Sequence, residues 1–114
     1  MKLLVSAIAA IVLVGCTSPS NHARLAGPYK TYTSHKTALV VAQCIEYSWQ
    51  DEAMLGREAE AFMQTGKDGF TVYNTGAEFF VDVKNRAGGA DVSYYAPASD
   101  TSTERRGAAL ATCL

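Results

Sequence analysis

The chain has 114 residues and a formal net charge of −1 at pH 7, and its ten basic residues form no cluster or stripe. Nucleic acid is therefore not an expected partner. This length predicts a single domain with one small hydrophobic core.

The first fifteen residues have the organisation of a bacterial export signal. Lys2 supplies the basic start, and residues 3–14 are uncharged and mostly apolar. This run is shorter than the roughly 20 apolar residues that a transmembrane helix needs. It closes on Leu13-Val14-Gly15-Cys16, which resembles the lipobox of bacterial lipoproteins. The resemblance implies cleavage before Cys16 and lipidation of its thiol. The alternative is an ordinary cleaved signal in which the cysteine is incidental.

A lipidated Cys16 implies a membrane anchor for the rest of the chain. Several acyl chains, palmitate among them, hold a protein stably, whereas one chain binds marginally. Thr17 stands where an aspartate would resemble an inner-membrane retention signal, so we expect the outer membrane, with the domain facing the periplasm or the cell surface. Residues 16–33 contain prolines and a glycine without apolar periodicity, which predicts a flexible tether before a single domain over residues 34–114.

The domain is predicted to open with an amphipathic helix. Ser34 suits the N-cap position, and Gly56 is a natural end. Apolar residues follow at helical spacing in between, namely Val40, Val41, Cys44, Ile45 and Trp49. An acidic cluster surrounds the helix end and is interpreted as a solvated face rather than as catalytic carboxylates. Its members are Asp51, Glu52, Glu58 and Glu60.

An antiparallel β-meander is predicted next. Residues 70–74, 79–84 and 90–95 read as strands between glycine-containing turns, and residues 61–65 are a candidate fourth strand. Connections this short cannot hold the crossover of a parallel sheet. Period-two alternation then predicts two faces. The face toward the helices takes Phe70, Val72, Phe79, Val81, Val83, Val92 and Tyr94, and the opposite face takes Tyr73, Phe80 and Tyr95 beside Asp82, Lys84, Asp91 and Ser93. On that second face, Asp82→Ala is expected to be nearly silent.

A last helix and a disulfide complete the predicted domain. Thr101 and Glu104 have the spacing of a capping box. Export delivers Cys44 and Cys113 to an oxidising compartment, which predicts one disulfide between them, and the spacing does not favour a redox-active pair. The predicted fold class is α+β: a three- to four-stranded antiparallel sheet with an N-terminal and a C-terminal helix packed on one face and joined by the disulfide.

The order of motifs after the signal resembles a group of small, uncharacterised proteobacterial lipoproteins. The motifs are Ala42-x-Cys44-Ile45-x-x-x-Trp49, Gly69-Phe70-Thr71-Val72, Val81-Asp82-Val83, Gly88-Gly89-Ala90-x-Val92-x-Tyr94-Tyr95 and Cys113-Leu114. They consist of core residues, turns and cysteines, so the resemblance implies no particular activity.

The sequence contains no catalytic or cofactor-binding constellation. His22 and His35 are isolated, and there is no nucleophile elbow, so neither an enzyme nor a bound metal or cofactor is expected. Tyr73, Phe80 and Tyr95 with a polar rim indicate a surface that binds another envelope protein. One alternative is that the tether or the segment around Met63 covers these aromatics. Others are a structural or prophage-encoded surface lipoprotein without a specific ligand, or, less favoured, a small enzyme or enzyme inhibitor.

Overall fold

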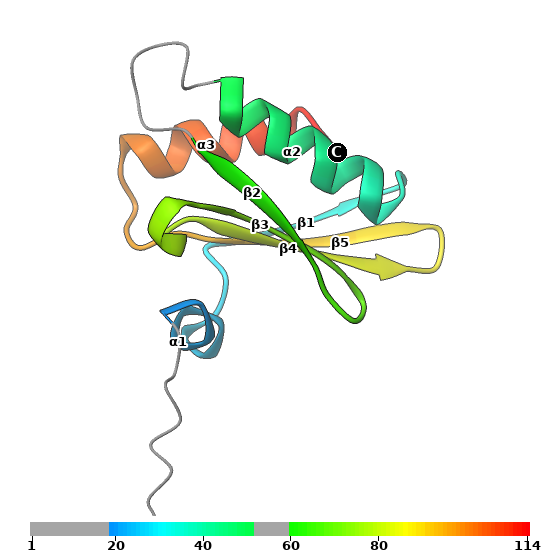
Figure 1. Cartoon of the computed structure of the whole chain (residues 1–114), viewed down its shortest axis with the longest axis horizontal. Helices are drawn as coiled ribbons and strands as arrows, with labels where there is room; N and C mark the ends of the chain where they lie inside the picture. Colours follow the sequence, from blue (N-terminus) through cyan, green and yellow to red (C-terminus); the bar gives the residue numbers. More distant parts are fainter. Residues whose placement is uncertain (1–18, 52–59) are drawn as a thin grey trace, which may run out of the picture.

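A computed structural model describes residues 19–51 and 60–114. In this part of the chain it shows an α+β fold with a five-stranded antiparallel sheet (Figure 1). The helices are α1 (Pro19–Ala26), α2 (Ala38–Asp51) and α3 (Thr101–Ala111), and a short 3-10 turn, η2, covers Thr75–Ala77. The strands are β1 (Lys30–Ser34), β2 (Ala61–Thr65), β3 (Gly69–Asn74), β4 (Phe80–Arg86) and β5 (Gly89–Tyr95), in the spatial order β1-β5-β4-β3-β2.

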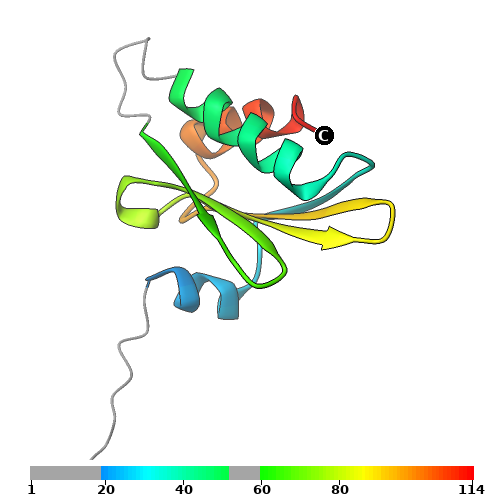
Figure 2. The same cartoon turned by 45° about the vertical axis from the view of Figure 1, so that its right-hand side comes forward.

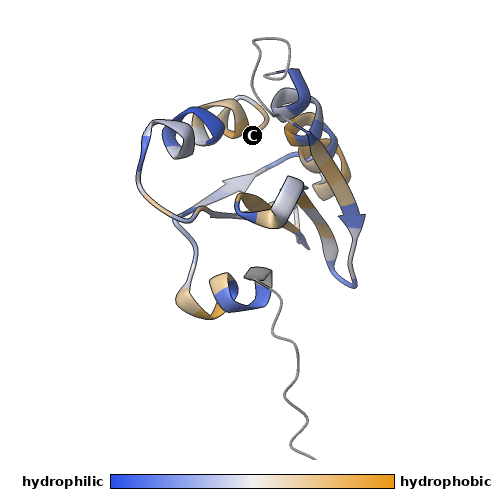
Figure 3. Cartoon of the chain, turned by 60° about the vertical axis from the view of Figure 1, so that its left-hand side comes forward, coloured by the Kyte–Doolittle hydropathy of each residue, from blue (hydrophilic) through white to orange (hydrophobic). Residues whose placement is uncertain are grey.

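Helices α2 and α3 lie on one face of the sheet and α1 lies on the other (Figures 1 and 2). The hydrophobic core fills the space between the sheet and the first pair, and hydrophobic residues run along α2 and the strands that face it (Figure 3). The residues predicted to face the helices all pack in or against this core. Two helices therefore cover one face, as predicted, whereas α1 on the other face is a third helix that was not predicted.

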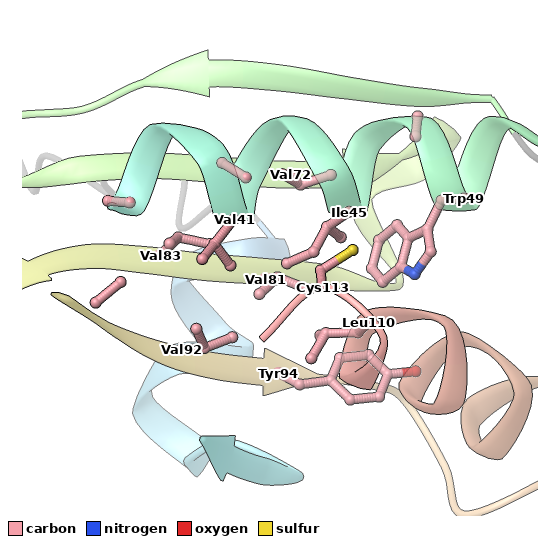
Figure 4. Packing of buried hydrophobic residues seen from close by; sticks show 14 of the residues in the cluster. Val41, Ile45, Trp49, Val72, Val81, Val83, Val92, Tyr94, Leu110 and Cys113 are labelled. Atoms are coloured by element: carbon pink, nitrogen blue, oxygen red, sulfur yellow. The ribbon is translucent and has the colours of Figure 1, made fainter. Parts of the chain in front are cut away.

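The core is built from α2 outward. Val41, Ile45 and Trp49 point from α2 to the sheet, where Val72 and Val81 are also fully buried (Figure 4). Each such side chain contributes about 1.5–3 kcal/mol by leaving water.

Two polar groups in the core have hydrogen-bond partners on α3. The Trp49 indole N–H donates to the Arg106 carbonyl oxygen at 3.1 Å, and the Tyr94 hydroxyl donates to the Thr103 carbonyl oxygen at 2.9 Å. These bonds fix where α3 lies against α2 and β5, since a buried donor left without a partner costs about 1–3 kcal/mol.

Residues 19–34 differ from the predicted tether. They form α1 and the edge strand β1, whose register with β5 runs from Lys30 opposite Tyr94 to Ser34 opposite Ala90. Four of the five β1 residues are exposed or half-buried, so the strand shows no apolar alternation for a sequence reading to detect. The backbone ladder to β5 and the packing of Tyr32 against the core hold this strand, and the sheet therefore has five strands instead of three or four.

The helix starts also differ from the predicted ones. Ser34 ends β1, and the residue before α2 is Thr37, whose Oγ1 accepts from the Val40 N–H at 3.4 Å. Helix α3 is capped by Asp100, whose carboxylate accepts from the Thr103 N–H at 2.9 Å. This cap stands one residue before the predicted capping box. The predicted helix end at Gly56 lies outside the described residues.

Candidate functional site

The candidate site lies on the face of the sheet opposite α2 and α3, which we call the α1 face because α1 lies beneath it (Figure 2). Side chains alternate between faces along a strand, so the neighbours of the core residues point here. The strand register aligns them in two rows. The aromatic row is Phe62, Tyr73, Phe80 and Tyr95, and the polar row is Gln64, Thr71, Asp82, Ser93 and Thr31.

The aromatic row contains all three residues predicted to bind a partner. Tyr73 lies opposite Phe80 on the neighbouring strand, and Phe80 lies opposite Tyr95. The Phe80 and Tyr95 rings stack with centroids 4.5 Å apart and an angle of 9° between their planes, and Phe62 meets Tyr73 at 5.6 Å. Tyr73 and Tyr95 are half-buried, and Phe80 is 0% exposed because Arg24 of the predicted tether lies over its ring, in agreement with the alternative that the tether covers these aromatics. Phe62, which is 43% exposed at the end of the row, was not among the predicted residues.

Arg24 from α1 covers Phe80 and binds Asp82. Its Cζ lies 4.9 Å from the centre of the Phe80 ring, within the range of a cation–π interaction. Its Nε and Nη2 lie 2.8 Å from the two carboxylate oxygens of Asp82, forming the bidentate pair that suits a planar guanidinium. Thr71 completes the group by donating to Asp82 Oδ1 at 2.7 Å.

Asp82 is buried and ionised, contrary to the expectation that it faces solvent. Burial by itself would raise the pKa of its carboxyl, but hydrogen bonds from Arg24 and Thr71 and the charges of Arg24 and Lys84 outweigh burial and hold the pKa below its usual value. The hydrogen bond to Asp82 likewise raises the pKa of Arg24. The pair therefore stays charged at neutral pH, and Asp82→Ala removes a bound carboxylate rather than a solvated one. The structure thus removes the basis for expecting a silent substitution, and we now expect Asp82→Ala to lower stability.

Burial also affects the neighbouring tyrosine. It raises the pKa of the Tyr95 hydroxyl, and the negative charge of Asp82 adds to this effect. Tyr95 is thus neutral at physiological pH and can offer its hydroxyl proton to an acceptor.

An open hollow of about 440 Å³ lies beside the Arg24–Asp82 pair. The connection between β2 and β3, residues 66–68, forms one side of it, and Gly69, Lys84 and Tyr95 contribute from the sheet. The charges around the hollow have both signs, with Lys67 and Asp68 adjacent in the connection. Such a mixture suits contact with a polar protein surface better than binding of a strongly charged small molecule.

Sequence reasoning missed Arg24 and Thr71 as members of this site. Thr71 carried a partial signal, because alternation places it on the same face as Tyr73. Arg24 carried none. It is 58 residues from Asp82 in sequence and belongs to a segment without apolar periodicity.

The other predicted site residues are placed as follows. Cys44 and Cys113 form the predicted disulfide, with Cα atoms 5.6 Å apart, and this bond joins α2 to the segment after α3. Cys16, the predicted lipidation site, lies outside the described residues. His22 and His35 are both exposed. Within residues 19–51 and 60–114, no three histidine, cysteine, aspartate or glutamate side chains gather as a metal site requires.

None of the helices in the described ranges has the length and apolar character needed to cross a membrane. Comparison of the chain with protein-family models, curated proteins and solved structures found no match.

Proposed function

We propose that the protein is a lipid-anchored, non-enzymatic binding module of the bacterial outer membrane, and that the α1 face contacts another envelope protein. The observation that carries this proposal is the aromatic row, which ends at the exposed Phe62 and is bordered by polar side chains. Partner surfaces are enriched in aromatic residues and have polar rims. Tyr73 and Tyr95 stay half-buried when α1 is in place, so part of the row can be reached without any rearrangement.

The start of α1 makes the proposed anchor short. Pro19 begins α1 three residues after Cys16, and three residues span at most about 10 Å, in place of the long tether expected from the sequence. With Cys16 lipidated and α1 docked, the α1 face is held close to the bilayer. When α1 leaves the sheet, the chain between Cys16 and Lys30 can extend to roughly 45 Å. Docking of α1 thus sets how far the domain reaches from the membrane.

We expect Cys16→Ser to abolish membrane anchoring. Without the thiol there is no thioether to lipid, so the variant should accumulate as an uncleaved precursor or as a soluble protein. Fractionation of cells and gel mobility of the tagged protein measure both outcomes. A variant that still fractionates with outer membranes and migrates like the wild type would refute the anchor.

We expect a photo-crosslinking amino acid at Phe62 to capture one envelope protein in intact cells. The same group at Gln43, exposed on α2 on the opposite side of the sheet, serves as the matched control and should not capture it. Mass spectrometry of the purified adducts identifies the product. The absence of any Phe62-specific adduct would contradict the binding module and favour a structural surface lipoprotein without a specific partner.

A further inference from the structure

We propose that Asp82, Thr71 and Phe80 form a guanidinium-binding site, which Arg24 occupies in this structure and which an arginine side chain of the protein partner occupies once α1 has left. This inference rests on the proposed function, because it names the chemistry that the partner presents to the α1 face. Arg24 is then an internal substitute for the ligand, and its helix is the cover of the site.

The site exists without α1. Asp82 lies on β4 between its neighbours β3 and β5. Thr71 is its direct register partner on β3 and donates to Oδ1 at 2.7 Å, which orients the carboxylate from within the sheet. Phe80 is held in place by stacking on Tyr95. Every one of these groups belongs to a central strand of the sheet, so their positions do not depend on the helix that now covers them.

The geometry selects a guanidinium. Two parallel N–H groups meet the two carboxylate oxygens at 2.8 Å each, while the flat cation lies over an aromatic ring at 4.9 Å. An ammonium group is a point charge that cannot make both parallel bonds and lie flat on the ring at once. A partner arginine fits the site and a partner lysine does not.

Helix α1 is held on the sheet mainly through Arg24. Helix α1 has eight residues, too few to persist alone, and Leu25, its only large apolar side chain, is 83% exposed. The helix therefore gains little from apolar burial, and the bonds from Arg24 to β3 and β4 are a large part of what docks it. Gly27 follows the helix with φ of +99°, a backbone conformation that favours glycine. Two residues later, the Tyr29 backbone N–H donates to the Tyr94 carbonyl oxygen and begins the pairing with β5. The chain can thus pivot at Gly27 while β1 stays paired.

Competition explains why such a site needs a cover. A tethered Arg24 acts at an effective concentration of millimolar or more, so a free arginine side chain cannot displace it efficiently. A partner that also contacts Phe62 and Tyr73 of the aromatic row gains enough binding energy to displace Arg24. Docked α1 therefore prevents binding of arginine-containing chains that do not also contact the aromatic row.

The first experiment uses the mature protein in detergent micelles and N-acetyl-arginine amide as the probe. The Arg24→Ala variant leaves the site empty, so the backbone amide signals of Thr71 and Asp82 in its NMR spectra should shift as the probe is added. Its affinity for the probe should be at least tenfold higher than that of the wild type. N-acetyl-lysine amide should bind to Arg24→Ala at least tenfold more weakly than N-acetyl-arginine amide does. The double variant Arg24→Ala, Asp82→Asn should lose binding of the arginine probe. If that double variant fails to fold, Arg24→Ala, Phe80→Leu replaces it: it keeps an apolar side chain at position 80 without the ring, and it should bind the arginine probe more weakly than Arg24→Ala does.

Three results would overturn the site: no shift in Arg24→Ala at tens of millimolar probe, equal binding by wild type and Arg24→Ala, or equal binding of the arginine and lysine probes. A second measurement separates this inference from the proposed function. With the crosslinker at Phe62, Arg24→Ala should raise the yield of the partner adduct several-fold and Asp82→Asn should lower it. Probe binding without any partner adduct rejects the protein-binding function alone, whereas an adduct that is unchanged in Asp82→Asn rejects the partner's arginine.

Discussion

Removing the Cys44–Cys113 disulfide is expected to lower the free energy of unfolding by about 4 kcal/mol. The bond closes a loop with a sequence separation of 69 residues, so it withdraws a large amount of conformational entropy from the unfolded chain. It also ties down α3, which has 11 residues and is too short to persist alone. The expected loss is a large share of the roughly 5–15 kcal/mol that stabilises a typical domain.

Guanidinium-induced unfolding of the wild type and of the double variant Cys44→Ala, Cys113→Ala measures this difference. The wild type in reducing buffer is the control, because it loses the bond without losing any atom of the core. Both should unfold at clearly lower denaturant concentrations. A shift below about 1 kcal/mol in both cases, or two free thiols titrated in the denatured, non-reduced wild type, would contradict the expectation.

Val81→Asp is expected to prevent folding at 25 °C. Val81 is 0% exposed on the central strand β4 and faces the core beneath α2 (Figure 4). A carboxylate there has no partner and costs several kcal/mol, which is comparable to the whole stability of a small domain. Circular dichroism and amide signal dispersion in NMR spectra should show an unfolded chain.

Gln64→Asp is the matched control for this substitution. It introduces the same charge on the α1 face of the edge strand β2, where Gln64 is exposed, and should change stability by less than about 0.5 kcal/mol. If both variants unfold, or if Val81→Asp folds normally, the assignment of the two faces of the sheet is mistaken.

The faces of the central strands could be predicted because they follow from local alternation. Val81 and Val83 alternate with Phe80 and Asp82 in one short run, and glycine-containing turns separate that run from its neighbours. The disulfide could be predicted from the number of cysteines, since only two remain beyond Cys16. Each of these inferences used residues close together in sequence or a property of composition.

Strand β1 could not be predicted in the same way. Its stabilisation comes from backbone hydrogen bonds to β5, and backbone groups are the same in every sequence. Polar residues such as Thr31 and Thr33 are acceptable on an edge strand, so the segment reads as a linker until its pairing partner is known.

The sequence by itself determined the α+β class, the two faces of the meander and the Cys44–Cys113 pair, because period-two alternation and cysteine number are local or compositional. Only the tertiary structure decided that Asp82 is buried with Arg24 and that Phe80 is covered. A carboxylate on a strand is solvated or paired depending on what lies above it, and here that group comes from 58 residues earlier in the chain. The chemistry of the α1 face therefore arises from a contact between distant segments, which no local pattern encodes.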